Sequence, residues 1–381
     1  MGVLTRKLRW YSIILYLVGS IISFVDPVTD ILTVSKFYHA GHKTWFGVGL
    51  LFIILPCLLL PMVQLFYSAS RQSCYLLYSH EIGKIRQLSF LCSCHPFSAA
   101  WANFQVLILC LKNFEKLWRG EGIDSVDPAP ESNDDVATED EATEDEEEKQ
   151  VVFSKVASYV EASVESTPQF IIQLYAMVVQ KEAIGTIQII SLLSSFTSIV
   201  VAFTFSEGLF YDKKGLFELL NLRKKISTSL LNVFFLSSRL FAITFFTVSY
   251  RWWILSVFVL RFSFIASLAA VQDGSCLTKL RELQAIMIIF FSVYWLKDAT
   301  FSDWFVTMNL GEEPRERFMK IRFLSKISCV VTNVVMILLY FFSSYSNNTW
   351  YAIPVTVYVC LWNGFSALRI IYKCSRYFFS E

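Results

Sequence analysis

Long apolar runs alternate with short polar segments along almost the whole chain. A run of about 20 apolar residues is long enough to cross the hydrocarbon core of a bilayer as a helix. We therefore predict eight membrane spans, at residues 11–34, 46–67, 156–179, 184–206, 227–249, 252–271, 323–344 and 350–371.

Two further apolar segments, His95–Leu111 and Leu277–Leu296, have the pattern of amphipathic or re-entrant helices. Such segments insert part-way when protein covers their backbone ends. In each half of the chain the order is two spans, a partial segment and two spans. The sequence thus predicts an all-α polytopic membrane protein with about eight transmembrane helices plus two partially inserted helices. They form two pseudo-repeat halves, 1–210 and 211–381, as in many transporters.

Lys and Arg gather on one side of the predicted spans. The opposite side keeps only Lys36, Lys43, Lys181 and Arg251. Because basic residues concentrate in cytoplasmic loops, both termini are expected in the cytosol. Hydrophobic residues make up 55% of the 381 residues, which fits this membrane assignment.

An acidic insert at 120–149 interrupts the first half. Residues 121–148 carry fourteen acids and no Lys or Arg, while the rest of the chain has 33 basic and 18 acidic residues. This composition predicts a disordered cytosolic loop. Ser132, Thr138 and Thr143 each precede an acid by three residues, the spacing that acidophilic kinases favour. The insert is either a solvated spacer or a site where phosphorylation adds further charge.

The nine cysteines do not form a secreted disulfide pattern. Cys74, Cys92, Cys94 and Cys374 lie near predicted cytosolic span ends, where reversible palmitoylation occurs. Cys92-Ser93-Cys94-His95 lacks a second pair of ligands, so we predict no metal site.

Ionisable and amide residues occur inside the predicted spans. Asp26 and Asp30 lie four apart in the first span and so share a helix face. A second set recurs every four residues in the third span, and two arginines lie in spans five and six. These residues are Glu161, Glu165, Gln169, Gln173, Arg239 and Arg261.

Each charge at mid-bilayer costs roughly 2.5–3.5 kcal/mol, so leaving six unpaired would cost on the order of 15 kcal/mol. That exceeds a typical net stability. The groups therefore form either a salt-bridge network that joins the halves or a hydrophilic track for a lipid head group or small solute. Pro27 and Pro168 lie among them, and each is expected to break its helix.

Several function classes lack their sequence signals. The chain has no phosphate-binding G-x-x-x-x-G-K-[ST] loop, no H-E-x-x-H and no G-x-S-x-G, and its four histidines are scattered. We therefore predict a protein that is not an enzyme, has no cofactor and has no nucleic-acid partner.

The segment 165–175 resembles the E-x-x-P-Q-L-x-L-Q-x-Y signature of the XK-related (XK/Kell-associated) membrane protein family. Phe170 and Ile172 replace two of its leucines. A second similarity covers 26–41. It comprises the paired aspartates Asp26 and Asp30, the basic residue Lys36, and an aromatic-aromatic-His-x-Gly sequence at 37–41, where the chain leaves the first span. The order of the hydrophobic segments extends the resemblance over nearly the whole chain.

This resemblance implies an apoptotic phospholipid scramblase of the plasma membrane. Several members expose phosphatidylserine on dying cells, which marks them for engulfment. The implied partners are membrane phospholipids and a single-span or lipid-transfer protein. The resemblance also implies that Gln169 and Gln173 extend a polar face between the halves. The charges on that face would be those of Asp26, Asp30, Glu161, Glu165, Arg239 and Arg261.

Two other functions remain open at this stage. One is a secondary transporter of small, amino-acid-like solutes, which would use the same broken helices and acids. The other is a membrane scaffold for a lipid-transfer protein or peptidase partner, which would depend more on its cytosolic loops than on its intramembrane charges.

Control of activity is expected to differ from that of apoptotic family members, in which caspases cut a terminal tail. Asp124-Ser125-Val126-Asp127 is followed by Pro128, which disfavours cleavage. We expect phosphorylation or partner binding at the acidic insert to regulate the protein instead. Deleting 121–148 should therefore change the rate of lipid scrambling in liposomes, and an unchanged rate would contradict this control.

Overall fold

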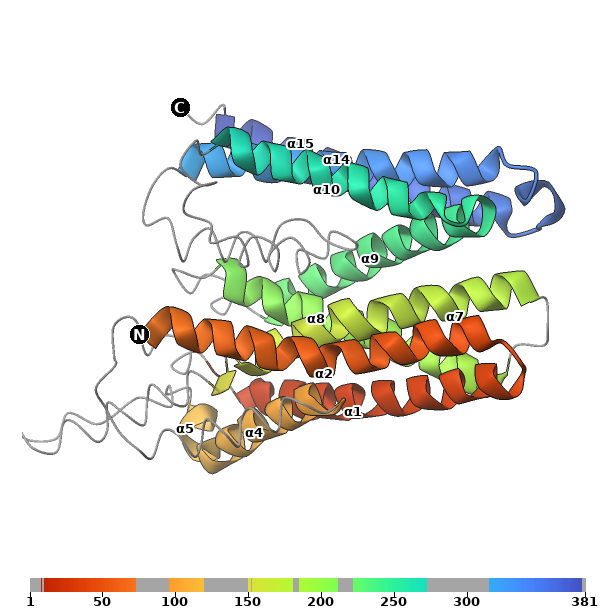
Figure 1. Cartoon of the computed structure of the whole chain (residues 1–381). Helices are drawn as coiled ribbons and strands as arrows, with labels where there is room; N and C mark the ends of the chain where they lie inside the picture. Colours follow the sequence, from red (N-terminus) through yellow and green to blue (C-terminus); the bar gives the residue numbers. More distant parts are fainter. Residues whose placement is uncertain are drawn as a thin grey trace, which may run out of the picture. The chain divides into compact units, whose positions relative to one another are not determined.

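The computed structural model describes residues 8, 10–72, 96–119, 150–151, 153–180, 185–211, 222–272 and 315–378. In these residues the secondary structure consists of helices joined by short turns, with no strand (Figure 1). The first half contains α1 (Trp10–His39), α2 (Lys43–Gln72), α4 (Ser98–Lys112) and α5 (Phe114–Arg119). A π-turn, η2 (Ala162–Ser166), then leads into α7 (Thr167–Gln180), which precedes α8 (Thr186–Tyr211). The second half contains α9 (Leu222–Tyr250), α10 (Trp253–Gln272), α14 (Arg315–Phe341), the short η3 (Ser346–Asn348) and α15 (Ala352–Phe378).

Four helices of the described part are long and apolar enough to cross a membrane. They are Trp10–His39, Lys43–Leu60, Thr186–Thr204 and Ser229–Tyr250. Helical residues also lie within each of the other predicted spans. The all-helical prediction is confirmed, while the count of eight spans stays a prediction.

A tight turn joins α1 to α2. Gly41 adopts a φ of +81°, a conformation that side-chain-bearing residues rarely take. The N–H of Gly41 donates to the carbonyl of Tyr38 (3.0 Å), and that of His42 donates to the carbonyl of Phe37 (2.9 Å). These two bonds form a Schellman motif, which satisfies carbonyls at the end of α1 and turns the chain back.

The predicted break at Pro27 is wrong. Pro27 lies inside α1, which is continuous from Trp10 to His39. Proline removes one backbone donor, but membrane helices tolerate it where neighbouring helices support the backbone. Here α1 packs against α2, α4 and α8, and Pro27 itself is buried.

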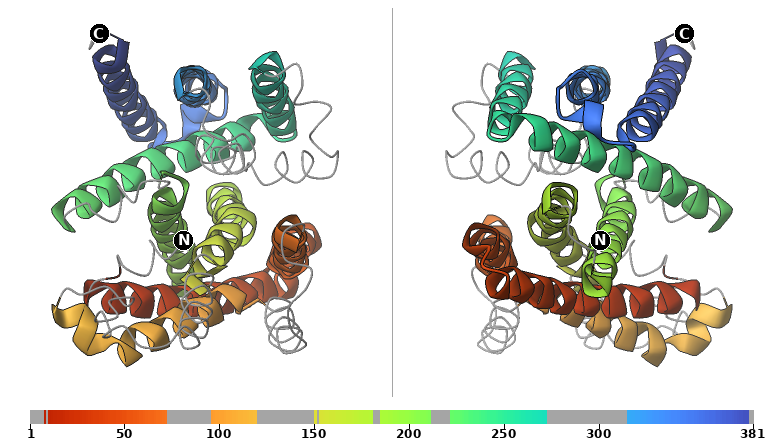
Figure 2. Two further views of the ribbon diagram at one scale, coloured as in Figure 1. Left: turned by 90° about the vertical axis from the view of Figure 1, so that its left-hand side faces the viewer. Right: turned by 90° about the vertical axis from the view of Figure 1, so that its right-hand side faces the viewer.

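The 15-residue α4 runs along α1 (Figure 2). At 1.5 Å per residue it is about 22 Å long, less than the roughly 30 Å of the hydrocarbon core. The buried Asn103 joins it to the next helical segment by accepting a bond from Ser154 (2.5 Å) and donating one to Ser158 (3.0 Å). Residues 98–111 of the predicted partial segment are therefore helical and too short to span a bilayer.

The chain divides into two compact units. Unit 1 comprises Met1–Phe170 and Ile184–Lys225, and unit 2 comprises Ile171–Ala183 and Ile226–Glu381. The division assigns 171–183 to the second unit and 211–225 to the first, so one boundary falls within α7 and another within α9. The pseudo-repeat halves 1–210 and 211–381 stay a prediction.

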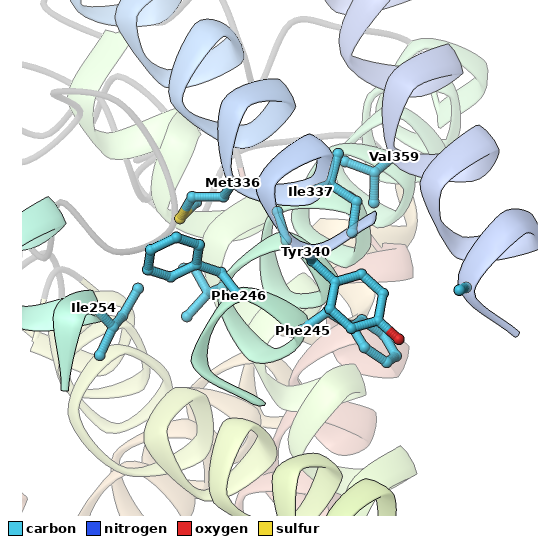
Figure 3. Packing of buried hydrophobic residues seen from close by; sticks show 10 residues of the cluster. Phe245, Phe246, Ile254, Met336, Ile337, Tyr340 and Val359 are labelled. Carbon is cyan, nitrogen blue, oxygen red and sulfur yellow. The ribbon is translucent and has the colours of Figure 1, made fainter. Parts of the chain in front are cut away.

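Aromatic residues fill the core of unit 2, where α9 runs across α10, α14 and α15 (Figures 2 and 3). Phe245 of α9 lies 5.1 Å from the ring of Tyr340 on α14 and 5.6 Å from that of Tyr351. Met336 and Ile337 of α14 belong to the same cluster. Burial of these large side chains holds the four helices together.

Several predicted features lie outside the described residues. They are the acidic insert 120–149 with Ser132, Thr138 and Thr143, the partial segment Leu277–Leu296, and the cysteines Cys74, Cys92 and Cys94. The backbone of Cys374 lies in α15.

Candidate functional site

Asp26 and Asp30 are fully buried one turn apart on α1. Oδ2 of Asp26 accepts a hydrogen bond from Ser166 (2.6 Å), and Oδ1 accepts one from Ser195 (2.8 Å). Oδ1 of Asp30 accepts a bond from Ser191 (2.6 Å) and lies 3.3 Å from Oγ of Ser195. Ser195 therefore lies between the two carboxyl groups and connects them.

These hydroxyl groups come mainly from one face of α8. Ser191, Ser195 and Ser198, here called the serine stripe, are spaced four and three residues apart and are buried against α1. Oγ of Ser198 also lies 3.3 Å from Oγ of Ser166. Sequence reasoning missed the serine stripe, although its spacing within an apolar span was the available signal.

Glu161 and Glu165 lie near the aspartates and are themselves buried, with 2% and 0% of their surface exposed. Both are close enough to Asp26 and Asp30 to interact electrostatically with them. Neither carboxyl group forms a hydrogen bond with any residue in the described ranges. We call Asp26, Asp30, Glu161 and Glu165 the acid cluster.

The backbone departs from α-helical geometry at this cluster. Ala162–Ser166 form the π-turn η2, which contains Glu165 and packs against α2 and α8. The N–H of Thr167 donates to the carbonyl of Ala162, and its hydroxyl donates to the same oxygen (2.7 Å). Pro168 has no N–H, so it cannot restore the regular α-helical bond to Val164. The disturbance predicted at Pro168 therefore takes the form of an adjacent π-turn, a feature frequent at functional sites.

Gln169 fixes the next turn of this segment to α2. Its Nε2 donates to the backbone carbonyl of Gly49 (2.6 Å), and the side chain is fully buried. A methyl group added at Gly49 would lie 2.6 Å from Cγ2 of Val34 on α1. Because Gly49 has no side chain, α2 can approach both α1 and the segment that contains Gln169 closely.

The remaining predicted residues belong to unit 2 and are also buried. Gln173 lies on α7, Arg239 on α9 and Arg261 on α10, with 1%, 0% and 4% of their surface exposed. Nη1 of Arg239 donates a hydrogen bond to Oδ1 of Asn333 on α14. The predicted network of salt bridges between the halves would require contacts between the two units, so it stays a prediction.

In unit 1 the site combines four carboxyl groups with hydroxyl donors, so it suits a cationic amine or another hydrogen-bond donor. In the ranges that the structure describes, no group of three or more His, Cys, Asp or Glu side chains is arranged to hold a metal ion. The acid cluster is therefore a polar site within apolar helices, whose outward side chains include Ile14, Ile21 and Leu193.

The comparisons point to one family. The family model described as XK-related protein matches residues 14–376, nearly the whole chain. A search of the curated proteins found no match to this chain.

Proposed function

The chain belongs to the XK-related family, and from this membership we propose that it is a phospholipid scramblase, which moves lipids between leaflets without ATP. Its proposed place is the plasma membrane, with both termini in the cytosol. There it would expose phosphatidylserine on apoptotic cells, which would then be engulfed.

The acid cluster is the observation that supports this proposal best. Four carboxyl groups are buried together between helices that present apolar side chains outward, and two of the four have no hydrogen-bond donor in the described ranges. A buried carboxylate is costly to maintain unless hydrogen bonds or charges compensate it. Its presence is therefore better explained by function than by stability.

Lipid scrambling has a matching physical requirement. A lipid can pass its head group along polar side chains while its tails stay in hydrocarbon, which removes most of the cost of taking charge through an apolar core. In this proposal the acid cluster receives head-group amines. Arg239 and Arg261 receive the phosphate, and Gln169 and Gln173 extend the polar route.

The proposal includes the finer architecture of eight spans and two partial helices in two pseudo-repeat halves. The helices found at all eight predicted positions support it, as does the shortness of α4. Membrane phospholipids would be the main partners, and a single-span or lipid-transfer protein a further one.

Scrambling by the purified full chain in liposomes tests the proposed function. Fluorescent lipids in both leaflets should become accessible to dithionite, and Glu165→Gln should slow this about tenfold. The amide keeps the shape of the side chain, but the charged interaction that it removes is worth about 1.5–3 kcal/mol.

Glu115→Gln is the matched control, because Glu115 lies exposed on α5 and should tolerate the same change. Fluorescence loss confined to the outer leaflet, both in the full chain and after deletion of 121–148, would contradict the proposal. Saturable, stereospecific uptake of an amino acid by the same vesicles would favour a transporter instead.

A further inference from the structure

The acid cluster contains two kinds of carboxyl group. Both oxygens of Asp26 accept hydrogen bonds from serines, and Oδ1 of Asp30 accepts one from Ser191. Glu161 and Glu165 are different, because none of their carboxyl oxygens meets a hydrogen-bond donor within the described ranges, although both side chains are buried. Serine hydroxyls therefore hold the aspartates, whereas the glutamates keep acceptor sites that a ligand can fill.

Gln169 adds a neutral acceptor to the same segment. Its Nε2 donates to the carbonyl of Gly49, and a carbonyl only accepts, so the amide nitrogen must face that carbonyl. The orientation of the amide leaves Oε1 for another donor, and this buried oxygen meets none in the part of the chain that the structure describes. We call Glu161, Glu165 and Gln169 the open acceptors.

The open acceptors differ in what they require from the two common kinds of head-group cation. An ionised carboxyl group and an amide oxygen accept hydrogen bonds, so they need N–H or O–H donors. The primary ammonium of phosphatidylserine and phosphatidylethanolamine brings three N–H donors with its charge. The quaternary ammonium of phosphatidylcholine brings the charge alone, and it would leave buried acceptors unfilled, at a cost of about 1–3 kcal/mol each.

We propose that the open acceptors select lipids whose head group carries a primary amine over lipids that carry choline. This inference rests on the proposed function, because it places head groups at the acid cluster. Asp26 has both oxygens bonded to serines, so it acts on a head group mainly through its charge, which is the same for both kinds of cation. Selection therefore follows the number of N–H donors that the head group offers.

A methylation series separates donor number from charge. Phosphatidylethanolamine, its N-methyl and N,N-dimethyl derivatives and phosphatidylcholine carry the same charges but three, two, one and no N–H donors. Each lipid, labelled on an acyl chain, is assayed in liposomes that contain the purified full chain. Scrambling should slow along the series, with about a tenfold difference between phosphatidylethanolamine and phosphatidylcholine, because a hydrogen bond to a charged group is worth at least that much.

Glu161→Met and Glu165→Met remove the carboxyl acceptors and keep a side chain of similar length. Each should lower the ethanolamine-to-choline ratio several-fold, and the double variant should abolish the preference. A purely steric effect of the added methyl groups would survive in these variants. Glu161→Gln keeps one neutral acceptor and the shape of the side chain. It should retain part of the preference, and it still reports if the methionine variants do not fold.

Asp26→Asn is the matched control, because it removes a charge from the same cluster and no open acceptor. It should slow all four lipids by a similar factor and leave their ratio unchanged. A second readout does not need transport. The four lipids are mixed in equal amounts with the full chain in detergent, and native mass spectrometry counts those that the chain retains, which should favour phosphatidylethanolamine.

Equal scrambling rates for the four lipids, or a ratio that the methionine variants leave unchanged, would overturn the inference and leave the proposed function intact. If the wild-type chain scrambles none of them but retains phosphatidylethanolamine over phosphatidylcholine, and Glu161→Met loses this preference, the inference stands and the proposed function falls. If the chain scrambles none of them and retains all four equally, both fall.

Discussion

Replacing Asp26 and Asp30 together with asparagine is expected to slow lipid scrambling about a hundredfold while leaving the helices in place. Each amide keeps the size of the carboxyl group and one acceptor oxygen, and where its nitrogen replaces the second oxygen of Asp26 the serine hydroxyl can turn to accept, so the local packing is preserved. The two charges that would meet a head-group amine are lost. Charged hydrogen bonds are worth about 1.5–3 kcal/mol each, so two of them account for roughly this factor.

Circular dichroism, thermal unfolding and the liposome assay together check this prediction. Thr29→Val is the control, because Thr29 lies on α1 between the two aspartates, and among the described residues its hydroxyl bonds only to carbonyls of its own helix. This isosteric change should leave the scrambling rate unaltered. A double asparagine variant that folds and scrambles at the wild-type rate would show that the aspartates serve packing alone.

Gly49→Ala is expected to lower the free energy of unfolding by about 1–3 kcal/mol, the usual cost of overpacking a buried site. The new methyl group would lie 2.6 Å from Cγ2 of Val34, which is almost fully buried and has little rotameric freedom. Relief of this clash would move α1 and α2 apart. The bond from Gln169 to the Gly49 carbonyl would then lengthen. Unfolding in detergent, followed by circular dichroism, measures the loss.

The same helix provides the control for this glycine. A methyl group at Gly47 would meet nothing within 4 Å, so Gly47→Ala should raise stability by about 0.4–1 kcal/mol through helix propensity. Combining Gly49→Ala with Val34→Ala removes the clashing atom. The double variant should therefore be less destabilised than the sum of its parts by about 1 kcal/mol or more. Strict additivity of the two changes would refute the proposed clash.

The helices were largely predictable from the sequence because apolar runs of this length have few alternatives in a bilayer. The spacing of Asp26 and Asp30 likewise placed both on one face of α1, where the structure has them. The continuous path of α1 through Pro27 was not predictable, because it depends on packing against helices that are distant in the sequence.

The serine stripe shows a different limit. Serine is common in membrane helices, where it can bond to its own backbone, as Ser20 does to the carbonyl of Tyr16. The spacing of Ser191 and Ser195 places them on one helix face, but it does not show that they donate to Asp30 and Asp26 while Ser20 bonds to its own helix. Only the contact between α1 and α8 decides which hydroxyls join the site. The sequence therefore identified the carboxyl groups within the spans, but it could not identify the serines that donate hydrogen bonds to them.

The π-turn at Ala162–Ser166 also bears on how this segment can be aligned and engineered. A π-turn accommodates one residue more than a regular α-helix would at the same place. If the turn became regular α-helix with all its residues kept, everything after it would rotate by about 100° relative to Glu161. Pro168 and Gln169 would then point in a different direction. Deleting one residue inside the turn would instead let the helix regularise with Pro168 and Gln169 in register, so the extra residue can be removed only within these five positions without turning the rest of the segment.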